Sequence, residues 1–86
     1  MPKVPSEVRE TWLEQQDQPF DLIVHVEGNA RERGDELQTL GFQVKRSFRL
    51  TNSVSLRGTG KQALQLLDTP WVTRIEPDRS VHAFRR

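Results

Sequence analysis

The 86-residue sequence has no cysteine, and its longest uninterrupted apolar run is Leu22-Ile23-Val24. The absence of cysteine excludes disulfides, thiolate metal ligands and cysteine nucleophiles. An apolar run this short falls far below the ~20 residues that a membrane-spanning helix needs. The first residues also lack the apolar segment of a signal peptide, so we expect neither membrane insertion nor an export signal. The sequence leaves the cellular compartment open.

An excess of charge of either sign is also lacking, because 13 Lys and Arg balance 12 Asp and Glu to a net charge of +1. Domains that bind nucleic acid usually carry a strongly basic balance, so the composition argues against that class. The only histidines, His25 and His82, lie in different elements, and no glycine-rich phosphate loop or carboxylate cage is present. We therefore expect no enzymatic activity, no cofactor and no metal.

The apolar pattern predicts a strand followed by a helix after residue 19. Residues 20–26 alternate apolar and polar side chains, which is the period of a half-buried strand. Asn29 is a suitable N-cap for an amphipathic helix over residues 30–40, and Gly41 is a suitable stop because glycine accepts a positive φ.

A hairpin, a second helix and a last strand follow. A strand over residues 42–50 and another over 53–58 are joined by a short polar turn. Thr59 and Gln62 have the spacing of a capping box for a short helix, and residues 71–75 form the fourth strand. On the second strand, one common inward face is expected for Phe42, Val44, Phe48 and Leu50.

The resulting order, β-α-β-β-α-β, predicts an α+β fold of the ferredoxin-like type. Its four-stranded antiparallel sheet carries two helices on one face and leaves the other face free. We assign residues 1–18 to an N-terminal extension, residues 19–79 to the ferredoxin-like domain and residues 80–86 to an extended tail. Within the extension, a short helix over residues 6–16 is expected, with Ser6 as its N-cap and Trp12 as its packing anchor.

The C-terminal stretch carries the most specific signal in the chain. A leucine-rich second helix leads through Pro70 into the strand over residues 71–75. Glu76-Pro77-Asp78 follows, and is expected to leave the sheet or run along an edge because proline cannot donate in a strand ladder. The tail has an aromatic residue near its end. This ordered set resembles the propeptides of subtilisin-type serine proteases and the free-standing inhibitors related to them. The matching positions are Pro70, Val72, Ile75, Glu76, Asp78, Val81, His82, Ala83 and Phe84.

The resemblance implies that the free sheet face docks on two surface helices of a subtilisin-like serine protease. The tail would then lie in the active-site cleft in the manner of a cleavage product. Phe84 would fill the S1 pocket, Ala83 and His82 would take the P2 and P3 positions, and Val81 would fill the S4 pocket. Glu76 and Asp78 would cap helix N-termini of the protease, which carry unpaired N–H donors and partial positive charge.

The resemblance leaves several points open. The chain continues past Phe84 with Arg85-Arg86, so Arg86 is an alternative occupant of S1. A stand-alone inhibitor and an excised propeptide that also assists folding of its protease are both compatible with the sequence. We expect a monomer in the absence of the protease.

Two other classes of protein share this fold. A nucleic-acid-binding domain would use the basic group on the hairpin, which comprises Lys45, Arg46, Arg49 and Arg57. The third strand, residues 53–58, lacks the aromatic residues on which such modules stack bases. A homo-oligomeric regulatory domain that pairs sheets or edges is the other alternative.

Overall fold

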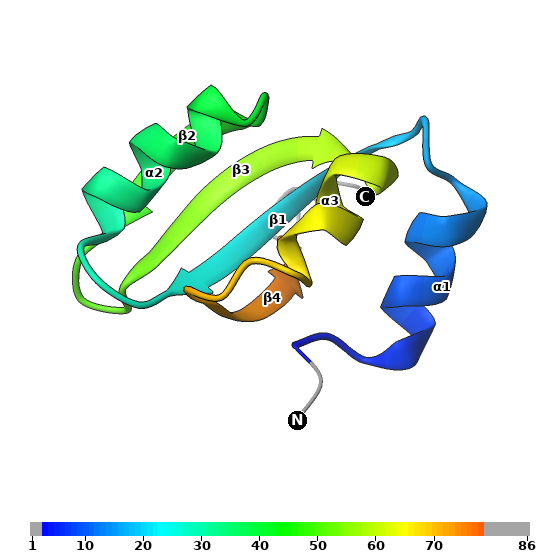
Figure 1. The fold of residues 1–86 in the computed structure, drawn as a ribbon, viewed down its shortest axis with the longest axis horizontal. Coiled ribbons are helices and arrows are strands. Elements are labelled where there is room, and N and C mark those ends of the chain that lie inside the picture. Colours follow the sequence, from blue (N-terminus) through cyan, green and yellow to red (C-terminus); the bar gives the residue numbers. More distant parts are fainter. Residues whose placement is uncertain (1–2, 79–86) are drawn as a thin grey trace, which may run out of the picture.

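The computed structural model describes residues 3–78, which form three helices and a four-stranded sheet (Figure 1). The elements, in chain order, are α1 (Ser6–Glu14), β1 (Pro19–Val26), α2 (Ala30–Thr39), β2 (Gln43–Phe48), β3 (Ser53–Thr59), α3 (Gly60–Leu66) and β4 (Val72–Pro77). All neighbouring strands are antiparallel, and the strand order across the sheet is β2-β3-β1-β4. This arrangement confirms the predicted ferredoxin-like α+β fold.

The helices lie against one face of the sheet (Figure 1). Residues directly opposite each other in an antiparallel pair share a face, so the register identifies both faces. Leu22 pairs with Leu56, and Val24 lies between Val54 and Ile75; all five side chains are buried on the helix side. The remaining apolar core residues are Val4, Trp12, Val26, Ala30, Leu37, Phe42, Ala63, Leu66 and Val72.

The predicted start signals of α2 and α3 are confirmed, and so is the stop at Gly41, whose φ is +104°. The Asn29 side chain accepts hydrogen bonds from the first-turn N–H groups of Arg31 and Glu32. Thr59 and Gln62 form the reciprocal capping box at the start of α3. Because these signals act over three residues, the local sequence is sufficient to specify them.

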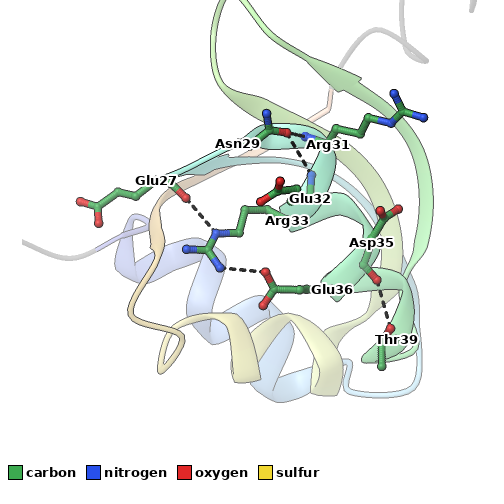
Figure 2. A network of polar contacts seen from close by, with 8 residues as sticks. All are labelled: Glu27, Asn29, Arg31, Glu32, Arg33, Asp35, Glu36 and Thr39. Atoms are coloured by element: carbon green, nitrogen blue, oxygen red, sulfur yellow. Dashed lines mark hydrogen bonds and ion pairs between the residues drawn. The ribbon is translucent and has the colours of Figure 1, made fainter.

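Arg33 connects the start of α2 with the loop before it and with the segment before β4 (Figure 2). Its guanidinium donates to the Glu27 carbonyl at 2.9 Å and to the Glu36 carboxylate at 2.8 Å. It also lies 4.7 Å from the centre of the Trp71 ring, a cation–π contact. One side chain thus connects the β1–α2 loop, helix α2 and the residue that precedes β4.

The inward pattern predicted for the second strand is wrong beyond Val44. Val44 pairs with Leu56 and Arg46 pairs with Ser55, so Lys45 is an extra residue in a β-bulge. Because side chains alternate with a period of two, one extra residue moves the following side chains to the opposite face. Phe48 therefore lies on the open face opposite Ser53, and Leu50 lies in the turn, fully exposed.

Helix α1 differs from the prediction at both ends. Pro5 is the N-cap and makes no side-chain capping bond, while Ser6 is the first helical residue. The Pro5 carbonyl accepts hydrogen bonds from the N–H groups of Val8 and Arg9. The helix ends at Glu14 rather than at residue 16.

The predicted anchoring role of Trp12 is confirmed, and residues 3–18 share the core of the domain. Trp12 is 1% exposed. The carbonyls of Gln16 and Gln18 accept hydrogen bonds from Lys61 and Gly60, two N–H groups in the first turn of α3. The segment after α1 thereby satisfies donors that would otherwise lack partners.

The N-terminal residues also close one edge of the sheet. The N–H of Ile75 donates to the Lys3 carbonyl at 3.0 Å, and the Lys3 ammonium donates to the Thr69 carbonyl at 2.6 Å. Pro77 lies two residues after Ile75, so its backbone nitrogen points to the same outer edge of β4. Proline has no N–H group, so no donor is left unpaired there. The outer edge of β4 is thus occupied over this stretch.

We predict that Trp12→Ala lowers the free energy of unfolding by about 3–5 kcal/mol, because it leaves a cavity between α1 and α3. The matched substitution Leu13→Ala, on the exposed side of the same helix, should change it by less than about 1 kcal/mol. Urea denaturation followed by circular dichroism measures both. Equal effects of the two substitutions would show that α1 does not contribute to the stability of the domain.

The two helical glycines should respond to alanine in opposite directions. A Cβ on Gly34 would make ordinary contacts at 3.7 Å with Val44 and 3.9 Å with Val54. Gly34→Ala should therefore stabilise the fold by about 0.5–1 kcal/mol, through helix propensity. A Cβ on Gly60 would lie 2.7 Å from the carbonyl oxygens of Trp12 and Gln15.

The Gly60→Ala substitution should therefore lower the free energy of unfolding by about 1 kcal/mol or more, because backbone atoms of α1 must move. Thermal and urea unfolding of the two variants provide the measurement. Stabilisation by Gly60→Ala would contradict the close approach of α1 to α3.

Candidate partner-binding face

The face of the sheet opposite the helices carries the candidate site. The strand register arranges its residues in three rows that run across β2, β3, β1 and β4. The first row holds Gln43, Arg57 and Asp21; the second holds Arg46, Ser55, Ile23 and Glu76; the third holds Phe48, Ser53, His25 and Arg74. We call these eleven residues, together with Asp78, the open face.

The two carboxylates singled out from the sequence both lie on the open face. Glu76 lies opposite Ile23 at the edge of the second row. Asp78 extends the first row, because its N–H donates to the Asp21 carbonyl at 2.9 Å. Its carboxylate lies 3.5 Å from the Ser55 hydroxyl. The other four predicted site residues, Val81, His82, Ala83 and Phe84, lie outside the described residues.

His25 is a neighbour of Glu76 that the sequence analysis did not name as a site residue. Its Nε2 atom lies 2.7 Å from the Glu76 carboxylate, and Arg74 Nε lies 3.7 Å from the same oxygen. Glu76 therefore has cationic or hydrogen-bonding neighbours on one side, while 39% of its side chain is exposed. The alternation of β1 already placed His25 on the non-core face, but the contact requires β4 beside β1.

Basic side chains gather at the β2–β3 side of the open face. Asp21 accepts a hydrogen bond from the Lys45 ammonium at 2.6 Å and forms an ion pair with Arg57 at 3.2 Å. The Arg46 guanidinium lies 5.9 Å from the centre of the Phe48 ring. The open face is thus basic along β2 and β3 and carries carboxylates along β4.

Small side chains occupy the centre of this face. Ser53 is 2% exposed and Ser55 is 7% exposed, and the Ser53 hydroxyl is hydrogen-bonded to Thr51 at 2.7 Å. Ile23 and Phe48 beside them are half-buried. A surface with short, already bonded side chains at its centre can approach a partner closely with little loss of side-chain entropy.

Metal binding and membrane insertion find no support in the part of the chain that the structure describes. Between residues 3 and 78, no three histidine, aspartate or glutamate side chains are grouped closely enough to hold a metal ion. None of the helices in this range is long and apolar enough to cross a membrane.

Within residues 3–78, the fold is a ferredoxin-like domain with a sheet face that none of its three helices covers, basic along β2 and β3 and carrying Glu76, Asp78 and Arg74 at the β4 side. Comparisons of the chain with models of protein families, with curated proteins and with solved structures found no significant match. The function must therefore be argued from the residues of the face itself.

Proposed function

We propose that this protein is an inhibitor of a subtilisin-like serine protease and that it can assist folding of that protease. It would dock by the open face and place its C-terminal tail in the active-site cleft in the manner of a product. The observation that carries this proposal is the common placement of Glu76 and Asp78 on the uncovered face, at the end of the strand that leads into the tail.

The spacing of the two carboxylates supports contact with a pair of helices. Residues two apart on one strand face are separated by about 7 Å along the strand. Packed helices lie about 8–10 Å apart, axis to axis, so adjacent helix N-termini have a similar separation. Each carboxylate could therefore accept hydrogen bonds from the N–H groups of a different helix, where the helix dipole favours negative charge.

The tail supplies the remaining argument, which rests on the sequence and on the resemblance to subtilisin propeptides. Val81 and Phe84 are apolar residues in a polar and charged segment. An extended segment can pair its backbone with a protease cleft as an added strand, while alternate side chains enter pockets. Phe84 is our proposed S1 residue, and Arg86 is the alternative.

A nucleic-acid-binding domain is the second candidate, favoured by one finding. The bulge at Lys45 puts Phe48 on the open face beside Arg46, which supplies an aromatic ring that the sequence pattern had assigned to the core. Binding to a single-stranded oligonucleotide that weakens steeply with added salt would support this candidate.

We predict that the purified protein competitively inhibits subtilisin acting on a chromogenic peptide, and that deletion of residues 81–86 abolishes the inhibition while the domain stays folded. Phe84→Ala should weaken inhibition by about 10- to 100-fold, the equivalent of burying one phenylalanine side chain. Arg86→Ala is the matched control and should change the inhibition constant by less than about 2-fold.

A larger effect of Arg86→Ala than of Phe84→Ala would reassign S1 to Arg86. Undiminished inhibition after deletion of residues 81–86 would contradict the role of the tail. Absence of inhibition by the intact, folded protein would contradict the proposal for subtilisin.

We further predict that Glu76→Gln and Asp78→Asn each weaken inhibition by about 2- to 5-fold, because each removes a charge that faces a helix N-terminus. Glu10→Gln, on the exposed surface of α1, is the control and should leave the inhibition constant unchanged. Progress curves at several inhibitor concentrations give the three constants. Equal, small effects of all three substitutions would show that the open-face carboxylates do not contact the protease.

A further inference from the structure

The two edge strands of the sheet, β4 and β2, differ in whether another segment of residues 3–78 pairs with their outer side. The outer edge of β4 is occupied by Lys3, whose carbonyl accepts the Ile75 N–H. β2 forms the opposite edge, and no segment within residues 3–78 pairs with its outer side. An edge strand with unpaired backbone groups can accept a further strand from another chain.

A groove runs beside this edge, between α2 and β2, with a volume of about 380 Å³. Its floor contains Gly34, which lacks a side chain, and the half-buried Val44. Arg31, Asp35, Lys45 and Arg46 also line it. The charged groups of Lys45 and Arg46 lie on the open face, at Asp21 and near the Phe48 ring. The lining is completed by Gln38 and Ser47. The bulge places Ser47 opposite Val54, on the helix side of the sheet.

Two of these cations have no carboxylate partner. Lys45 is bonded to Asp21. In the part of the chain that the structure describes, neither Arg31 nor Arg46 forms an ion pair. Figure 2 shows the Arg31 side chain extended away from Glu32 and Glu36 on the same helix. Arg31 on the helix side and Arg46 on the open face are therefore two cations beside the β2 edge that have no ion-pair partner within residues 3–78.

A second copy of this chain is disfavoured as the occupant. Antiparallel pairing of two β2 strands would bring Lys45 and Arg46 of one copy close to the same cations of the other. Like charges across a strand pair are destabilising.

We propose that the outer edge of β2 and the α2–β2 groove bind an extended acidic segment of a partner protein, which adds to the sheet as a fifth strand. Side chains of the added strand would alternate between its two faces. Those on the helix side would lie over Gly34 and Val44, where small apolar residues fit. Those on the other side would lie near Arg46, where carboxylates are favoured.

The backbone edge of β2 is separate from Glu76 and Asp78, because β3 and β1 lie between β2 and β4, while Arg46 belongs both to this edge and to the open face. A protein bound at β2 would therefore leave Glu76 and Asp78 uncovered. The inference stands whether or not the protein inhibits a protease.

The test is a titration of ¹⁵N-labelled protein with the peptide acetyl-(Glu-Val)₄-amide at low salt. We expect amide shift changes concentrated in Gln43–Phe48 and Ala30–Thr39, and slower amide hydrogen exchange in β2. Peptide-induced changes confined to other elements, or no binding at millimolar peptide, would overturn the proposal.

Charge variants separate this site from general ionic attraction. Arg31→Glu and Arg46→Glu should each weaken peptide binding by about 10-fold, because each replaces an attraction with a repulsion. Lys61→Glu makes the same change of charge on the exposed start of α3 and should leave the affinity within about 2-fold. The spectrum of each variant reports whether it is folded.

Three further results would overturn the proposal. Equal binding of a peptide N-methylated at alternate residues would show ionic association without strand pairing. Shift changes in β2 that follow protein concentration in the absence of peptide would assign the edge to a second copy. Tighter binding of a decauridylate to the same residues would assign it to nucleic acid.

Discussion

The alternation of side chains along β1 is the constraint on which the rest of the structure depends. β1 pairs with β3 on one side and with β4 on the other. The positions of β1 that point to the helices therefore determine which residues of β3 and β4 lie on each face of the sheet. Leu22 and Val24 point to the helices and bring Leu56 and Ile75 into the same core. The residues that alternate with them, including Ile23 and His25, therefore lie on the open face. A slip of one residue would exchange the two faces and expose the core.

The N-terminal segment, residues 3–18, supplies apolar contacts and hydrogen-bond partners that the βαββαβ unit would otherwise lack. Trp12 extends the core beyond α3, the carbonyls of Gln16 and Gln18 accept the first N–H groups of α3, and Lys3 occupies the edge of β4. Each contact removes a polar or apolar group from water. A domain of this size buries too little surface to leave such groups without partners at no cost. The outer edge of β2 receives no such contact within residues 3–78.

The distribution of charge distinguishes the two edges of the sheet. In the proposals above, the carboxylates at β4 would accept hydrogen bonds from helix N-termini, and Arg31 and Arg46 beside β2 would attract an acidic strand. Small, buried serines at the centre of the open face allow close approach of a large partner. The near-zero net charge does not reveal that Lys45, Arg46 and Arg57 lie along β2 and β3 while Glu76 and Asp78 lie along β4 and just after it.

Local sequence determined the order of the elements, the cap at Asn29, the capping box at Thr59 and the stop at Gly41, since each acts over a few residues. The sequence pattern ended the fourth strand at residue 75, so the placement of Glu76 and Asp78 on one face became visible only in the structure, where β4 continues to Pro77. Only the tertiary structure decided the bulge at Lys45, because an extra residue is visible only against the register of β3. The same holds for the His25–Glu76 contact and for the bond from Ile75 to Lys3, which join residues far apart in the chain. Backbone pairing between distant segments decides these contacts, and no local pattern encodes it.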